Sequence, residues 1–415
     1  MTSRIRWVYP PIGFVMNVAL GTVYSWSVFR VPLEKAFNWS TFESGLPFTV
    51  FLALFGLTMP VAGKIMGVLG AKKTALGGAV LVGLGWTLAR FVEYTPQPLA
   101  FMLFFYGVLA GVGVGLVYGV PIAVSSKWIP ERKGLATGIT ILGFGLSPLI
   151  TAITAAHLIK TVGVLETFLY LGVAFAIVLI VLSLPLKFPS PNWKPPALAA
   201  RKVITYTEST SRQMIRTLTF VGLWLTYVFG TSGGFIAISL AAKYASEFLG
   251  LAPAVCASLT AGFAVFNGIG RPVFGYLCDR IGPRMIAVLS FVIITAAAVM
   301  ATGATTLPLY LASFALLWFT FGGWLAIAPA ATSTFFGLQN LGSNYGIVFT
   351  AYGMGAIVGP VIASYIYGVA QSYTLAFMTT AVLSIVGMVV AFLTYKPPRS
   401  VMERTQTVPA MQVKS

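Results

Sequence analysis

The sequence predicts an all-α membrane protein with twelve transmembrane helices in two pseudo-symmetric six-helix bundles and both termini in the cytoplasm. Three observations lead to this prediction. The chain of 415 residues is 58% hydrophobic and only 8% charged, which leaves too few charged residues to cover a soluble protein. Apolar runs of about 20 residues recur from end to end, and each could cross a bilayer core of about 30 Å. A polar segment divides these runs into two sets of six.

The first set of apolar runs forms the predicted N-terminal bundle, residues 1–186. Its first run follows Arg4 and Arg6 and lacks the small-residue cleavage pattern of a signal peptide, so we interpret it as a spanning helix. The predicted helices of this bundle are 7–30, 42–63, 74–93, 98–126, 134–159 and 165–186.

The segment 187–216 begins "KFPSPNWKPP" and is rich in Pro, Lys and Arg, which is typical of a cytoplasmic linker. The C-terminal bundle, 217–395, follows it, and the polar tail, 396–415, is predicted to lie in the cytoplasm. The predicted helices of the second bundle are 217–243, 253–278, 284–304, 307–335, 343–369 and 373–395.

The distribution of Lys and Arg predicts the orientation of the chain. With both termini inside, 20 of the 26 Lys and Arg residues fall on cytoplasmic segments and five fall outside. This is the asymmetry of the positive-inside rule. The net charge of +17 therefore reflects topology, and the sequence has no basic domain or arm that would hold a nucleic acid.

The two halves of the chain share weak internal repeats, which are typical of transporters built from two related bundles. Glycines of "GKIMGVLGAKK" recur 212 residues later in "GYLCDRIGPR", as Gly63 with Gly275 and Gly70 with Gly282. A second set recurs at a spacing of 208 residues, namely Pro121 with Pro329, Gly134 with Gly342 and Gly138 with Gly346.

Arg271 is the one Lys or Arg residue inside a predicted helix core. It lies eight residues from Asp279, or about 12 Å at 1.5 Å per residue, and so near the middle of the bilayer. A charge there costs at least about 2.5–3.5 kcal/mol. Asn267 lies one turn away on the same face. We expect the intervening and following Gly268, Gly270 and Pro272 to let the helix bend and admit a ligand.

Three explanations for Arg271 are open. Its side chain could snorkel to the cytoplasmic interface, or it could pair with an acid from another helix. The third explanation is an anionic substrate, because Arg grips a carboxylate through two parallel hydrogen bonds. We favour this one, because Arg280 already serves the interface and the acids of the chain fall in predicted loops or helix ends.

The sequence resembles the major facilitator superfamily of transporters. The loop signature G-x-x-x-D-[RK]-x-G-[RK]-[RK] is matched by a conformational loop motif, namely Gly275, Asp279, Arg280, Gly282 and Arg284. The first-half copy departs from it, since Gly67 stands where the acid belongs. The segments "YSW" (24–26), "VYG" (117–119), "KWIPERKGLATG" (127–138), Asn267 to Pro272 and "NYG" (344–346) resemble the oxalate/formate antiporter family, and within it a bacterial lactate-type monocarboxylate transporter, homologous to the mammalian ones.

The resemblance implies alternating access around a central cavity, and it indicates which residues line that cavity. Tyr24 and Tyr118 match cavity aromatics of the oxalate transporter, whereas Phe144, Phe321 and Leu325 replace others. Tyr352 stands where the oxalate transporter carries a lysine, so one fixed charge remains, which suits one carboxylate. The predicted substrate site comprises Arg271, Asn267, Tyr118, Tyr24, Tyr352, Leu146, Phe321 and Phe349.

The function predicted from these residues is secondary active transport of small monocarboxylates such as lactate and pyruvate across the inner (cytoplasmic) membrane, by proton-coupled symport. Carboxylate exchange stays open, because Asn267 replaces the aspartate that the mammalian branch uses for proton coupling and His157 is expected at a helix end. A proton-driven drug exporter is a weaker alternative. We predict a monomer that is not an enzyme and has no catalytic set, metal site or cofactor.

Overall fold

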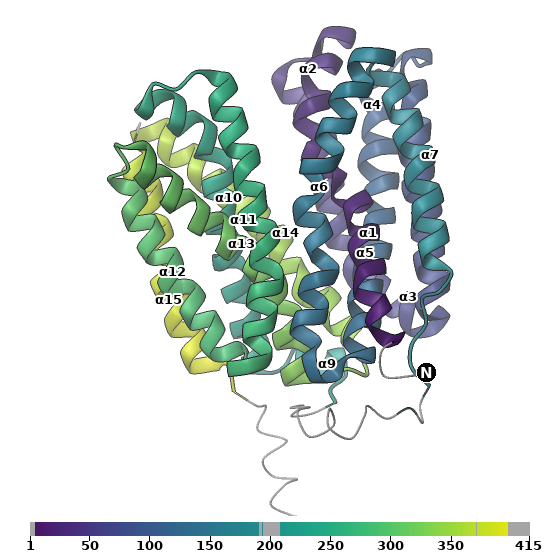
Figure 1. Ribbon diagram of the computed structural model, residues 1–415, viewed down its shortest axis with the longest axis vertical. Helices are drawn as coiled ribbons and strands as arrows, with labels where there is room; N and C mark the ends of the chain where they lie inside the picture. Colours follow the sequence, from purple (N-terminus) through teal and green to yellow (C-terminus); the bar gives the residue numbers. More distant parts are fainter. Residues whose placement is uncertain (1–4, 191–192, 194–207, 371, 397–415) are drawn as a thin grey trace, which may run out of the picture.

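The computed structural model describes residues 5–190, 193, 208–370 and 372–396. These ranges are helical without a strand, and a helix corresponds to each of the twelve predicted spans (Figure 1). Most of the predicted linker and of the tail lies outside the described residues. The predicted all-α class is therefore confirmed, while the cytoplasmic placement of the termini stays a prediction.

The N-terminal bundle consists of six spans, of which the first is interrupted by a 3-10 turn. That span comprises η1 (Ile5–Val8), α1 (Tyr9–Leu20), η2 (Gly21–Ser25) and α2 (Trp26–Phe37). The others comprise α3 (Thr41–Ala89), η3 (Arg90–Tyr94), α4 (Pro98–Met102), a π-helical η4 (Leu103–Ala110), α5 (Gly111–Trp128), η5 (Pro130–Arg132), α6 (Lys133–Val162) and α7 (Val164–Ser183).

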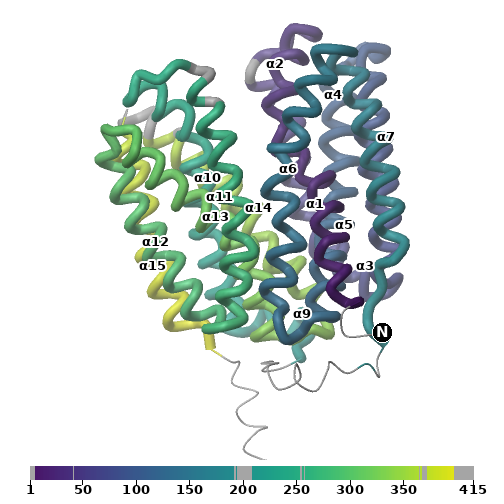
Figure 2. Tube along the Cα trace, in the orientation of Figure 1, coloured from purple at the N-terminus to yellow at the C-terminus, as the bar shows by residue number. Residues whose placement is uncertain are grey.

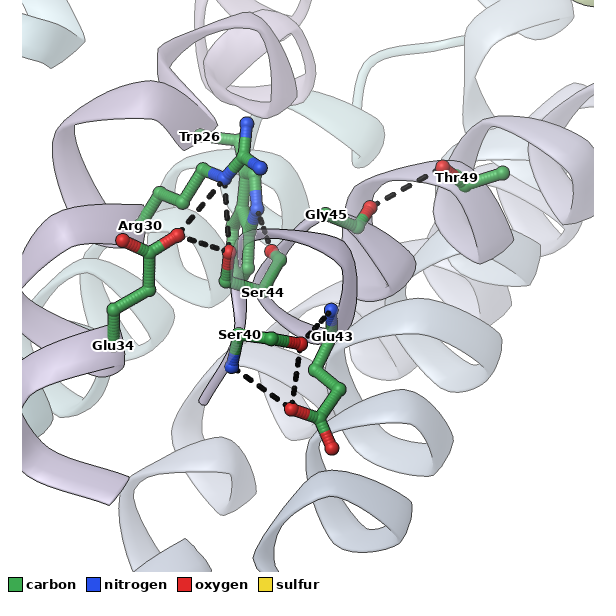
Figure 3. A network of polar contacts seen from close by, with 8 residues as sticks. All are labelled: Trp26, Arg30, Glu34, Ser40, Glu43, Ser44, Gly45 and Thr49. Atoms are coloured by element: carbon green, nitrogen blue, oxygen red, sulfur yellow. Dashed lines mark hydrogen bonds and ion pairs between the residues drawn. The ribbon is translucent and has the colours of Figure 1, made fainter. Parts of the chain in front are cut away.

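Helix α3 carries two predicted spans. Its backbone leaves helical geometry at Gly70, where φ is +78°, a conformation that glycine adopts without strain. The helix begins with a capping box, in which the Ser40 hydroxyl accepts from the Glu43 N–H and the Glu43 carboxylate accepts from the Ser40 N–H (Figure 3). Arg30 of α2 donates to the Ser44 hydroxyl at 2.9 Å and fastens α2 to this helix start.

The C-terminal bundle follows the short helix α9 (Ser211–Met214). Its helices are α10 (Leu218–Leu249), α11 (Pro253–Ile281), α12 (Pro283–Thr302), α13 (Leu307–Phe336), α14 (Leu341–Ala370) and α15 (Tyr373–Thr394). Within the described ranges, ten stretches are long and apolar enough to cross a membrane, and one of them, Phe42–Tyr94, carries two spans. Helix α11, which carries Asn267 and Arg271, is not among the ten.

The two bundles stand side by side and lie closer together at one end than at the other. Figures 1 and 2 show them converging at the end where the N-terminus and α9 lie, and diverging at the opposite end. We refer to these as the closed end and the open end. The orientation predicted from the positive charges would place the closed end in the cytoplasm.

Glycines bring backbone against backbone where the bundles cross near the closed end. A Cβ on Gly275 of α11 would lie 2.2 Å from the Gly134 carbonyl oxygen of α6. A Cβ on Gly63 of α3 would lie 2.3 Å from the Gly342 carbonyl oxygen of α14. The two crossings thus use the glycines that repeat in the sequence, paired across the bundles, and the repeat marks a pseudo-symmetric interface.

The conformational loop motif seals one of these crossings. The Asp279 carboxylate accepts from the backbone N–H groups of Gly134 and Leu135, each at 2.8 Å, at the start of α6. A carboxylate at a helix N-terminus is favoured by the helix dipole. The other motif residues lie close by: Arg280 over the Tyr276 ring at 5.2 Å, Gly282 with φ +84°, and Arg284 donating to the Phe392 carbonyl oxygen at 2.6 Å.

The other crossing, between Gly63 and Gly342, lacks an acid equivalent to Asp279, because Gly67 stands at that position. A carboxylate from the end of the linker lies nearby instead. Glu208 accepts from the N–H groups of Leu338 and Gln339, at 3.1 and 2.8 Å, just before α14. Lys127 of the other bundle interacts electrostatically with Glu208 and donates to the Gln339 carbonyl oxygen at 3.1 Å. Glu208, at the end of the linker, therefore interacts with both bundles and helps to hold the closed end together.

Asp279→Asn is expected to loosen the closed end, because it removes the negative charge from the start of α6, which is worth about 0.3–2 kcal/mol. The measurement is the distance distribution between spin labels at Val68 and Met285, which are exposed residues in different bundles. We expect an additional population at longer distance. An unchanged distribution would show that the carboxylate does not hold this crossing.

Candidate functional site

A cavity of about 550 Å³ lies between the two bundles, in the half of the molecule nearer the open end. The residues around it are mostly apolar, and none of those described is Lys, Arg, Asp or Glu. They come from both bundles and include Tyr24, Leu52, Gly145, Leu149, Ala152, Phe235, Thr260, Ala264, Asn267, Trp318, Phe321 and Ala356. The cavity therefore suits a small molecule with an apolar body.

Two tyrosines link the bundles at the floor of this cavity. The hydroxyl of Tyr24, in η2, is hydrogen-bonded to the hydroxyl of Tyr352, in α14. Tyr24 lies on the cavity wall, whereas Tyr352 is only 1% exposed and stacks on Phe349 with ring centroids 4.9 Å apart. This contact separates the open cavity from the packed layer toward the closed end.

Arg271 is fully buried, and its guanidinium is held by neutral oxygens. Nη1 donates to the Ile141 carbonyl oxygen at 2.7 Å, while Nη2 and Nε donate to Asn267 Oδ1 at 3.2 and 3.4 Å. The guanidinium carbon also lies 5.8 Å from the ring centre of Phe144. No carboxylate in the part of the chain that the structure describes pairs with this cation.

Arg271 lies one layer below the cavity and does not line it. The cavity ends on Asn267 and Gly145, and both contact the guanidinium: a Cβ on Gly145 would lie 2.9 Å from Arg271 Nε. The sequence places Arg271 in the predicted substrate site, whereas in this structure the open cavity stops at Asn267 and Gly145. In this conformation Asn267 and Gly145 lie between the cavity and the guanidinium, so a ligand in the cavity would have to displace the Asn267 side chain or pass Gly145 to bind it.

The glycines beside Arg271 do not open the helix as predicted. Helix α11 continues through Pro272, and the glycines make room for neighbouring helices instead. A Cβ on Gly270 would lie 2.1 Å from the Phe319 carbonyl oxygen, and one on Gly268 would lie 2.5 Å from Leu146 Cδ2. Close packing explains both positions, because a side chain there would push apart α11 and α13, or α11 and α6.

The other predicted site residues fall into two layers. Phe321 and Tyr24 line the cavity, as Asn267 does. Tyr118 and Phe349 lie in the buried layer with ring centroids 5.3 Å apart. The ring centroids of Phe321 and Tyr352 are 6.4 Å apart. Leu146 packs against Gly268, next to Arg271. The structure therefore gathers all eight around the floor, although only three border the open space.

Three residues at this place were not predicted from the sequence. Trp318 lines the cavity, and its indole N–H has no acceptor among the described residues. Tyr227 and Tyr345 belong to the buried layer, where their hydroxyls make no well-formed hydrogen bond within the described ranges. Tyr345 could have been recognised from the sequence, since it precedes Tyr352 by seven residues and so lies on the same helix face. His157 is exposed near the open end of α6, remote from all of these.

Comparisons with known proteins identify the family. The Major Facilitator Superfamily model matches residues 12–236 and 223–412. The oxalate:formate antiporter of Oxalobacter formigenes is 29% identical over 404 residues, which cover 95% of this chain and 92% of that protein. Monocarboxylate transporter 14 of Homo sapiens is 21% identical, and the match covers 95% of this chain and 90% of that protein. The structure of FucP from E. coli, solved in the outward conformation, matches with a TM-score of 0.74 at 16% identity, and the match covers 95% of this chain and 99% of FucP. The chain therefore belongs to the Major Facilitator Superfamily of membrane transporters.

Proposed function

We propose that this transporter carries small monocarboxylates with an apolar body, such as lactate and pyruvate, across the cytoplasmic membrane. The observation that carries the proposal is Arg271, a fully buried cation without an ion-pair partner among the described residues. A charge at this depth persists only where something compensates its lost hydration. The carboxylate of a substrate would provide that compensation in each transport cycle.

The donors of Arg271 support this assignment. A guanidinium has five N–H groups, and the hydrogen bonds to Ile141 and Asn267 use three of them. Asn267 Oδ1 occupies the Nε and Nη2 edge, where a carboxylate would bind through two parallel bonds. In the proposed binding step, the substrate carboxylate enters from the cavity and replaces Oδ1 on this edge. Asn267 then turns its amide N–H groups toward the substrate.

The charge of the cavity supports a monocarboxylate in particular. Among the described lining residues there is no second cation, and Tyr352 near the floor is neutral. One fixed charge balances one carboxylate, whereas a dianion would leave one charge unpaired in a poorly hydrated site. The apolar walls then hold the rest of the substrate. Relatives named as an oxalate:formate antiporter and a monocarboxylate transporter support carboxylates as the substrate class.

Alternating access would operate around the two glycine crossings. In the proposed cycle, the substrate enters from the open end, the bundles close over it, and the crossings at Gly63 and Gly275 separate to release it at the other end. With the closed end in the cytoplasm, the structure would correspond to the outward-facing state. The proposed mode is symport with a proton.

Exchange of one carboxylate for another is a second candidate, and one observation favours it. No titratable carboxyl group in the described ranges contacts Arg271 or Asn267, so no side chain next to the cation is suited to carry the proton. An empty carrier would then have to reorient with an uncompensated buried charge. A substrate bound on both halves of the cycle removes that cost.

Uptake of labelled lactate into proteoliposomes tests the function and separates the two modes. Symport predicts accumulation in empty vesicles under an inward proton gradient, and collapse of that accumulation by a protonophore. Exchange predicts uptake only when the vesicles are loaded with unlabelled carboxylate, independent of the gradient. Protein-free liposomes are the control. The absence of uptake under both conditions would contradict monocarboxylate transport.

A further inference from the structure

Three buried tyrosines form a cluster on the closed-end side of the cavity floor. Tyr118 of α5, Tyr227 of α10 and Tyr345 of α14 surround the ring of Phe349, with centroid distances of 5.3, 6.4 and 5.7 Å. Each of the three is at most 1% exposed. They come from both bundles and meet at the interface that must open for release.

The hydroxyls of this cluster make no hydrogen bond of normal geometry to any residue in the described part of the chain. They lie near one another, since the Tyr345 hydroxyl interacts with those of Tyr118 and Tyr227. Tyr244 and Tyr310 are equally buried, yet each donates to a backbone carbonyl oxygen at 3.0 Å. Buried polar groups without a partner are rare and costly. Three such hydroxyls side by side are suited to share one ligand that accepts hydrogen bonds.

The position of the cluster relates it to Arg271. Along α14, Tyr345 lies seven residues from Tyr352 toward the closed end, or about 10 Å at 1.5 Å per residue. The Arg271 guanidinium interacts electrostatically with Tyr118 and Tyr227. Arg271 therefore lies between two environments, the cavity on one side and the three hydroxyls on the other.

We propose that Tyr118, Tyr227 and Tyr345 form a second carboxylate site, which takes the substrate from Arg271 as the closed end opens. The inference rests on the proposed function and adds to it Tyr227, Tyr345 and a direction of transfer. When the bundles rock apart, Tyr118 moves away from the two tyrosines of the C-terminal bundle. The space created between them is bordered by three O–H donors and lies in the field of Arg271.

A carboxylate matches this space better than other ligands. Its two oxygens only accept hydrogen bonds, so they can satisfy all three hydroxyls. The nearby guanidinium attracts an anion and repels a cation, and that interaction is strong where water is excluded. A water molecule would also satisfy hydroxyls, but it carries no net charge and is attracted by the guanidinium less strongly than an anion is. Hydroxyls hold an anion less tightly than a guanidinium does, which suits a site from which the substrate leaves.

The test is the double variant Tyr227→Phe, Tyr345→Phe, which keeps both rings around Phe349 and removes only the hydroxyls. Initial rates of labelled lactate transport are measured in right-side-out and in inside-out membrane vesicles. We expect the KM for lactate presented at the closed end to rise about a hundredfold, because two hydrogen bonds to a charged acceptor are lost and each is worth about a factor of ten or more. The KM for lactate presented at the open end should stay within about twofold, because that route meets Arg271 first.

Tyr106→Phe is the matched control. The Tyr106 hydroxyl is also buried without a partner, but it lies inside the N-terminal bundle, against Trp26 and Trp86. Its removal should change neither KM. A double variant with both KM values at the wild-type level would overturn the inference and leave the proposed function standing, and so would an equal rise on both sides. Wild-type protein that transports no lactate in either vesicle type would instead overturn the proposed function itself.

Discussion

Arg271→Ala is expected to abolish lactate binding and transport, and Arg271→Lys to weaken binding by about a hundredfold or more. Two hydrogen bonds to a charged acceptor are worth about 1.5–3 kcal/mol each, and about 1.4 kcal/mol is a factor of ten. Lysine keeps the charge but loses the planar fork that holds both carboxylate oxygens. Arg271→Ala should not prevent folding, because it removes a buried charge whose desolvation is costly. Arg271→Lys should fold as well, because it keeps one cation at the same depth.

The measurement is lactate affinity by calorimetry on purified protein, together with uptake in proteoliposomes. Arg280→Lys is the matched control, since Arg280 lies over Tyr276 near the closed end and is not part of the cavity. It should leave affinity within about twofold of the wild type. Lactate transport by Arg271→Ala at the wild-type rate would show that the buried cation does not bind the substrate.

The second large effect is expected from Tyr352→Lys, which adds a cation beside the floor of the cavity. With Arg271 as the one cation there, oxalate and malonate should compete poorly with labelled lactate in the wild-type protein. At about 4 Å and an effective dielectric constant of about 20, one ion contact is worth about 4 kcal/mol before desolvation. The variant should therefore gain dicarboxylate binding and lose part of its lactate binding. Repulsion from Arg271 would lower the pKa of the introduced lysine and reduce the gain.

Competition by oxalate against labelled lactate measures this effect in both proteins. Tyr352→Phe is the control, because it breaks the hydroxyl contact with Tyr24 without adding charge. It should retain the preference for lactate. Strong inhibition of the wild-type protein by oxalate would contradict the match between one charge and one carboxylate.

Much of the fold is predictable because its physical cause is local. A segment that spans a bilayer must be apolar over about 20 residues, so most of the helices follow from the apolar runs of the sequence. The crossing glycines were also detectable, since Gly63 and Gly275 occupy related places in two similar bundles and both need room for a backbone. The break in α3 is another local effect, because the φ of +78° falls on a glycine, Gly70.

The site was less predictable, because it depends on how the two bundles meet. The distance of Arg271 from the end of its predicted helix placed it near the middle of the membrane. That distance could not show that Asn267 covers the guanidinium on the cavity side. The Tyr24–Tyr352 contact joins residues that are 328 positions apart and lie in different bundles. Gly268 and Gly270 were misinterpreted for the same reason, since a glycine that serves a ligand and one that serves a neighbouring helix look alike in a sequence.

The glycine crossings have a thermodynamic consequence for how the transporter responds to its substrate. In the proposed cycle the backbones touch at Gly63 and Gly275 only while the closed end is sealed, so side-chain volume there would add free energy to one state and not to the other. A methyl group that costs about 1.4 kcal/mol shifts the ratio of the two states tenfold. The affinity measured from each side scales with the fraction of molecules open to that side. Residues that never meet the substrate therefore help to set the concentration at which each face of the membrane becomes saturated.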